Sequence, residues 1–158
     1  MYRLSDVKAL KLSRIPSGFA EFDRVLGGGI VPGSIVLISG DPGIGKSTLL
    51  LQTAMTIAQG TGKGENKIKG ETVLYVTGEE SAQQVKIRAD RIDKSPNDLF
   101  ILPITNVDGI VAACQKINPT LLIIDSIQTL TTERLSGSAG SVGQVRECAQ
   151  ILQALAKS

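Results

Sequence analysis

The chain has no histidine and no tryptophan, and it has only two cysteines in 158 residues. The missing histidine excludes the Ser-His and Cys-His pairs that activate nucleophiles in many hydrolases. Any general base must therefore be a carboxylate, a lysine or a tyrosine. Cys114 and Cys148 lie far apart, each in a segment with apolar periodicity, which predicts buried free thiols rather than a disulfide or a metal site.

Aromatic residues make up only 3% of the chain, so no base-stacking platform is visible. The net charge of +2 is too weak to imply nucleic acid as a partner. No apolar run approaches the roughly 18–20 residues that cross a bilayer, and residues 1–12 are polar, unlike a secretory signal. We expect a cytoplasmic protein without a membrane segment, with an N-terminal extension (1–12) and one domain (13–158).

Apolar segments with the pattern of a strand alternate along the chain with segments that have the period of a helix. This alternation predicts an α/β fold. Strands are predicted at 35–39, 72–77, 99–102 and 121–125, and helices at 46–59, 81–92, 107–117 and 142–157. A short helix capped by Ser17 precedes them. Such βαβ units predict a mostly parallel sheet with helices on both faces. Surface loops are expected at 60–70, which carries Lys63, Lys67 and Lys69, and at 131–141, which looks mobile.

A phosphate-binding loop is the strongest motif. The run matching G-x-x-x-x-G-K-[ST], with the next residue, is Gly40, Asp41, Pro42, Gly43, Ile44, Gly45, Lys46, Ser47 and Thr48. The glycines let consecutive N–H groups point at an anion, and the following helix adds its positive dipole end. In such loops Lys46 is expected to reach the β- and γ-phosphates and Ser47 to ligate Mg²⁺, while Thr48 lies near the α-phosphate.

Acidic residues follow two of the predicted strands. Asp125 ends the strand 121–125, where ligands of open α/β sheets bind, so we expect it to hold the water shell of Mg²⁺ near Ser47. Glu79 and Glu80 follow the strand 72–77. Hydrolysis needs a residue that orients the attacking water, for which Glu79 is the first candidate and Glu80 the second. The alternative is that one or both glutamates stabilise the start of the next helix.

Several longer motifs carry a family resemblance. These are RIPSGFAEFDRVLGGGIVPGS, LISGDPGIGKSTLLLQ, VLYVTGEESAQQVKIRADRI, LLIIDSIQTL and GSVGQVREC. Together they resemble the ATPase core of the bacterial RadA (Sms) family, which are RecA-like proteins of DNA repair and recombination.

The resemblance implies a RecA-like P-loop NTPase that hydrolyses ATP with Mg²⁺ and works on single-stranded or branched DNA. It implies a homo-oligomer, hexameric in the full-length family, and a RecA-type recombinase as partner. By position, Lys46 and Glu79 are catalytic, Ser47 and Asp125 hold the metal, and residues 131–144 occupy the place of a mobile DNA-contacting loop.

The sequence also departs from the family pattern. The family normally carries an N-terminal four-cysteine zinc motif, a later KNRFG motif and a Lon-protease-like domain, so we expect an incomplete core. No arginine stands out as the finger that stabilises the transferred phosphoryl group, although Arg88, Arg91 and Arg134 are conceivable. Gln83 and Arg88 are candidate adenine contacts.

Two alternatives to a DNA repair motor stay open. One is a different RecA-like ATPase, such as a replicative helicase or a KaiC-like regulator, and the motifs GEES and QVREC argue against it. The other is a nucleotide-binding fragment with little turnover.

Overall fold

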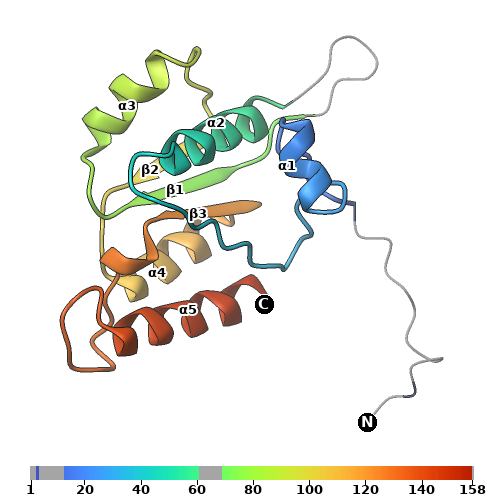
Figure 1. Ribbon diagram of the computed structural model, residues 1–158. Helices are drawn as coiled ribbons and strands as arrows, with labels where there is room; N and C mark the ends of the chain where they lie inside the picture. Colours follow the sequence, from blue (N-terminus) through green and yellow to red (C-terminus); the bar gives the residue numbers. More distant parts are fainter. Residues whose placement is uncertain (1–2, 4–12, 61–68, 158) are drawn as a thin grey trace.

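The computed structural model describes residues 3, 13–60 and 69–157. Its centre is a parallel sheet of three strands in the order β2-β1-β3 (Figure 1). Strand β1 (Val73–Thr77) pairs with β2 (Leu99–Leu102) on one side and with β3 (Leu121–Asp125) on the other. In this register the last residue of β1, Thr77, lies opposite Asp125. The carboxyl ends of β1 and β3 therefore meet at one edge of the sheet.

Helices cover both faces of the sheet, because successive residues of β1 point to opposite sides. Val73 and Tyr75 pack against α2 (Lys46–Gln59) and α3 (Ala82–Asp90). Leu74 and Val76 pack against α4 (Val107–Ile117) and α5 (Val142–Ala156). Figure 1 shows these helix pairs above and below the strands. The predicted α/β class with helices on both faces is confirmed.

Helix ends follow from local chemistry. Helix α3 begins with a capping box, in which the Ser81 side chain accepts from the Gln84 backbone and the Gln84 side chain accepts from the Ser81 backbone. Helix α4 begins at the Asn106 side chain, which accepts from the N–H of Gly109, and ends at Asn118 in the left-handed region. The bounds of α2, β2, α4 and β3 agree with those predicted, and β1, α3 and α5 differ only at their ends.

The predicted Ser17 cap is wrong. Helix α1 (Ala20–Val25) begins after Phe19, and no side chain caps it. Ser17 is buried instead, where its hydroxyl accepts from the N–H of Phe19 and its own N–H donates to Asp23. The hydroxyl thus bonds a backbone group before the helix rather than inside it.

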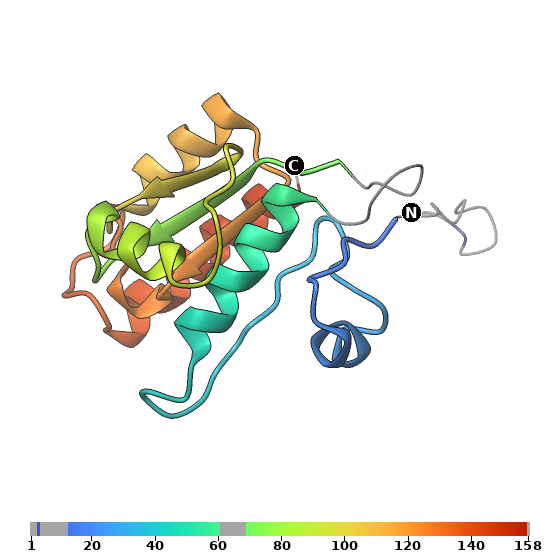
Figure 2. The same ribbon diagram turned by 90° about the horizontal axis from the view of Figure 1, so that it is seen from above.

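The predicted strand at 35–39 is also wrong. The segment forms no strand, and its side chains Ile35, Val36 and Leu37 are 54%, 40% and 78% exposed. After the isolated bridge between Ile15 and Ile30, the chain runs without regular structure to the phosphate loop (Figure 2). A strand needs a neighbour for its backbone groups, and none lies beside this segment in the part of the chain that the structure describes.

Two other predictions touch residues outside those described. Of the extension 1–12 only residue 3 is described, so the extension stays a prediction. Lys63 and Lys67 lie outside the described residues as well, whereas Lys69 is described and exposed. Among the described residues, none of the helices has the length and apolar character needed to traverse a bilayer.

Candidate nucleotide-binding site

The loop 40–45 leads directly into α2, as its motif predicts. Gly43 and Gly45 have φ angles of 78° and 101°, in the left-handed region that side chains with a Cβ rarely adopt. A Cβ built on either would meet nothing within 4 Å. These glycines are therefore required by backbone conformation and not by crowding. The same open space leaves room for an anion at the N-terminal end of a 14-residue helix.

Lys46, the first residue of α2, folds back over this loop. Its Nζ donates to the carbonyl oxygens of Gly40 and Asp41, both at 2.8 Å. An ammonium group has three donors, so two bonds to the loop leave one for a ligand. The cation is thus held at the loop that it was predicted to serve. Thr48, in the same first turn, is exposed.

Ser47 and Asp125 meet although 78 residues separate them in the sequence. The Ser47 hydroxyl donates to Asp125 Oδ1 at 3.1 Å. Hydroxyl and carboxylate oxygens are ligands that Mg²⁺ accepts. No group of three or more His, Cys, Asp or Glu side chains suited to a metal occurs among the described residues. One hydroxyl and one carboxylate fit Mg²⁺, because this ion commonly takes its remaining ligands from water and phosphate.

Tyr75 is a member of the site that sequence reasoning missed. From the middle of β1, its hydroxyl donates to Asp125 Oδ2 at 2.6 Å. Burial raises the pKa of Tyr75 above its usual range, and the Asp125 carboxylate raises it further. The hydroxyl therefore stays protonated and remains a donor. The one signal available was that Tyr75 and Thr77 lie on the same face of β1, beside the strand that ends in Asp125.

Arg88 joins this group from α3. Its Nη2 lies 2.8 Å from Glu80 Oε2, 3.3 Å from the Tyr75 hydroxyl and 4.0 Å from Asp125 Oδ2. The guanidinium is therefore engaged inside its own domain, which argues against the suggested adenine contact or finger. The other candidates are more exposed: Gln83 and Arg91 lie on the surface, and Arg134 pairs with Asp108.

The two glutamates after β1 have different surroundings. Glu80 is half-buried, with its N–H bonded to Thr77 Oγ1 at 3.0 Å and its carboxylate paired with Arg88. Glu79 is exposed, and no hydrogen bond or ion pair engages its side chain in the described part of the chain. The preceding Gly78 donates its N–H to the Asp125 carbonyl at 3.2 Å. Both glutamates therefore lie at the edge of the sheet that carries Asp125, and only Glu79 has a free carboxylate.

Gln144 of α5 is a second residue whose role sequence reasoning missed. The segment 131–141 has no helix or long strand, as predicted, but one end of it is anchored. The buried Gln144 amide accepts from the N–H of Thr132 at 2.8 Å and donates to the carbonyls of Thr132, Leu135 and Gly137. The sequence did contain one signal for this role, because Gln144 is a polar residue within the apolar pattern of a helix. Arg146, at the far edge of the segment, is exposed.

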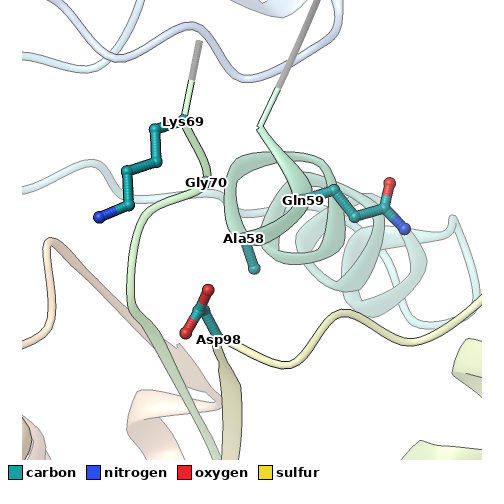
Figure 3. Close-up of a pocket in the computed structure, with 5 residues that line it drawn as sticks. All are labelled: Ala58, Gln59, Lys69, Gly70 and Asp98. Carbon is teal, nitrogen blue, oxygen red and sulfur yellow. The ribbon is translucent and has the colours of Figure 1, made fainter. Parts of the chain in front are cut away.

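A cavity of about 360 Å³ lies at the other end of α2 (Figure 3). Ala58, Gln59, Lys69, Gly70 and Asp98 line it, and the side chains of Gln59 and Lys69 point in opposite directions. At about 1.5 Å per residue, α2 places this cavity roughly 20 Å from the phosphate loop. The cavity is not part of the candidate site.

Both thiols are free and buried, as predicted. Cys114 lies in α4 and Cys148 in α5, within the core on the face of the sheet opposite α2. Neither takes part in the candidate site.

Comparison with known proteins supports a nucleotide-binding role. Residues 2–158 match a family model described as an AAA domain. The chain is 48% identical over 156 residues to the DNA repair protein RadA of Streptococcus pneumoniae, covering 99% of this chain and 35% of that protein. It is 46% identical over 155 residues to RadA of Haemophilus influenzae, covering 98% and 32%. The chain thus spans about a third of the length of the curated relatives it matches, and the resemblance to RadA is confirmed.

Proposed function

The chain belongs to the AAA domain family, and on that premise we propose that it binds ATP with Mg²⁺ and hydrolyses it as part of a DNA repair protein. The observation that carries the proposal is the contact of 3.1 Å between Ser47 and Asp125. The fold brings a hydroxyl next to a phosphate loop and an acid from a distant strand into one place. That arrangement is what a nucleotide bound with Mg²⁺ requires.

Each residue of the site has a separate task in this proposal. The loop amides and Lys46 bind the phosphates, while Ser47 and Asp125 hold Mg²⁺, which neutralises charge on the phosphate oxygens. Glu79 orients the attacking water, since its carboxylate is exposed and unpaired among the described residues. Glu80 is less suited, because a carboxylate held by Arg88 at 2.8 Å would have to break that ion pair first.

The wider function rests on the relatives. We propose that the segment 131–144 contacts single-stranded or branched DNA through its loop, and that the protein acts as a homo-oligomer, a hexamer in its full-length form. A RecA-type recombinase is the proposed protein partner. The names of the relatives support the role in DNA repair, and Gln144 supports the loop as a defined element, because it anchors the loop to α5.

The test is ATP hydrolysis by the chain with and without single-stranded DNA. We expect Lys46→Ala to lose ATP binding while keeping the wild-type circular dichroism spectrum. Glu79→Gln should bind ATP with wild-type affinity but lose turnover by 10²-fold or more, on the order of a general-base contribution. Glu80→Gln is the matched control in the adjacent position. Normal ATP binding by Lys46→Ala would overturn the site, and a larger loss in Glu80→Gln than in Glu79→Gln would exchange their roles.

One observation favours a second candidate, a nucleotide-binding unit with slow turnover on its own. Of the arginines considered as fingers, Arg88 and Arg134 are held by Glu80 and Asp108. Phosphoryl transfer commonly takes this cation from a neighbouring subunit. Turnover that rises steeply with protein concentration would indicate a neighbour's cation, whereas rapid hydrolysis by the monomer would exclude this candidate.

A further inference from the structure

The Asp125 carboxylate has its two oxygens committed to different partners. Oδ1 accepts from Ser47 at 3.1 Å, and Oδ2 accepts from Tyr75 at 2.6 Å. A carboxylate that terminates a strand is free to rotate about its last side-chain bond, which has no sharp preferred angle. The hydroxyl of Tyr75 removes that freedom. With Oδ2 held, Oδ1 is directed at Ser47 and the phosphate loop.

Tyr75 itself is well fixed. The residue is 0% exposed, and its ring lies in the core between β1 and the helices α2 and α3. Only the hydroxyl reaches the site, so its position is set by the packing of the ring. The Tyr75 hydroxyl also accepts from Arg88 at 3.3 Å, which satisfies both its donor and its acceptor capacity.

Tyr75 also determines how closely Arg88 approaches the acid. The Arg88 Nη2 atom lies 3.3 Å from the Tyr75 oxygen but 4.0 Å from Asp125 Oδ2. Glu80 holds the guanidinium at 2.8 Å and the Tyr75 hydroxyl accepts a hydrogen bond from it, so Arg88 and Asp125 form only a long ion pair of 4.0 Å. A carboxylate bonded to an arginine competes poorly for a metal ion, because its charge is already neutralised.

From these contacts we infer that Tyr75 is a positioning residue for Asp125, the proposed metal-binding acid: it holds Asp125 so that one oxygen faces Ser47, and it keeps Arg88 from a direct hydrogen bond to the carboxylate. The inference rests on the proposed function, because it assumes that Ser47 and Asp125 hold Mg²⁺. Partners that orient metal ligands typically change metal affinity 10- to 100-fold when they are removed. Tyr75 reaches one oxygen of a single ligand, so the expected effect lies near the lower end.

The test measures binding of AMP-PNP, which is not hydrolysed, across a Mg²⁺ titration and in EDTA. In Tyr75→Phe we expect the Mg²⁺ concentration at half-saturation to rise about tenfold, with unchanged AMP-PNP affinity in EDTA. Thr53→Val is the matched control, because the Thr53 hydroxyl is buried and has no hydrogen-bond partner among the described residues. That variant should titrate like the wild type.

The variant Arg88→Gln tests whether an effect of Tyr75→Phe comes from lost positioning of Asp125 or from a general disturbance of the contacts around it. It leaves the bond between Tyr75 and Asp125 in place and removes a cation 4.0 Å from the acid. The Mg²⁺ concentration at half-saturation should therefore equal that of the wild type or be lower. A wild-type Mg²⁺ midpoint in Tyr75→Phe, or a tenfold rise of the midpoint in Arg88→Gln, would overturn the inference but leave the proposed function standing. Failure of the wild-type chain to bind AMP-PNP more tightly with Mg²⁺ than in EDTA would overturn the proposed function, and the inference with it.

Discussion

Replacing Gln144 tests whether one buried amide holds the segment 131–141 in place. Its side chain makes four hydrogen bonds, of which the two to the backbone of Thr132 are buried. A hydrogen bond contributes about 0.5–1.5 kcal/mol net, and leaving a buried partner unpaired costs about 1–3 kcal/mol. The bonds to Leu135 and Gly137 count for less, because both residues are exposed and their carbonyls can bond water.

We therefore expect Gln144→Ala to lower the free energy of unfolding by about 2–3 kcal/mol. For a domain of this size that loss corresponds to a fall in Tm of roughly 5–10 °C. Gln153→Ala is the matched control, because it makes the same change at an exposed position of the same helix. Urea unfolding followed by circular dichroism measures the difference between the two variants.

Gln144→Glu sharpens this test. The carboxylate keeps an acceptor for the N–H of Thr132 but has no donor for the three carbonyl oxygens that the amide contacts. We expect a loss at least as large as that of the alanine variant, together with faster tryptic cleavage after Arg134 in the released segment. Equal urea midpoints for Gln144→Ala and Gln153→Ala, with equal cleavage rates, would refute the anchoring role.

Two further predictions concern packing and pH. Gly78→Ala should lose about 1–3 kcal/mol of stability in urea unfolding, because its Cβ would lie 1.9 Å from Thr129 Oγ1 and 2.5 Å from Thr129 Cβ. Gly143→Ala, which meets only the end of the Leu135 side chain at 3.0 Å, is the control, and an equal loss there would contradict the steric explanation. Burial raises the pKa of the Cys114 and Cys148 thiols, so the folded chain holds both protons more tightly than the unfolded chain does. The stability from the neutral thiols is therefore full at pH 7 and is lost as pH rises above the ordinary thiol pKa of about 8.5. The fall in urea midpoint between pH 7 and pH 10 should shrink when both cysteines are changed to alanine, and an unchanged fall would refute the assignment.

Local chemistry explains why sequence patterns predicted the bounds of several elements correctly. Helix α2 begins after Gly45, a left-handed residue that no helix continues through, and β3 is an apolar run that ends at a charged side chain. The meeting of Ser47 with Asp125 was also predicted, because ligands of open α/β sheets bind at the edge formed by the carboxyl ends of the strands, and Asp125 ends β3. The alternation of strand and helix was enough to imply that edge.

The segment 35–39 shows where such reasoning fails. Its apolar run is typical of a buried strand, yet Leu37 is 78% exposed and no ladder forms in the described part of the chain. Apolar periodicity reports which side chains favour burial, but a strand also needs the backbone of a neighbour. The sequence of the segment does not show whether that neighbour is present.

By itself the sequence determined the phosphate-loop motif, the order of the helices and of the strands β1, β2 and β3, and the family to which the chain belongs, and it predicted Asp125 as the acid that holds the metal. Those features depend on residues close together in the chain or on a general rule of parallel sheets. The tertiary structure alone decided that Tyr75 bonds Asp125, that Arg88 pairs with Glu80, and that Gln144 anchors a loop. Each of these contacts joins side chains from separate segments, so it depends on strand register and helix packing, which local patterns do not fix.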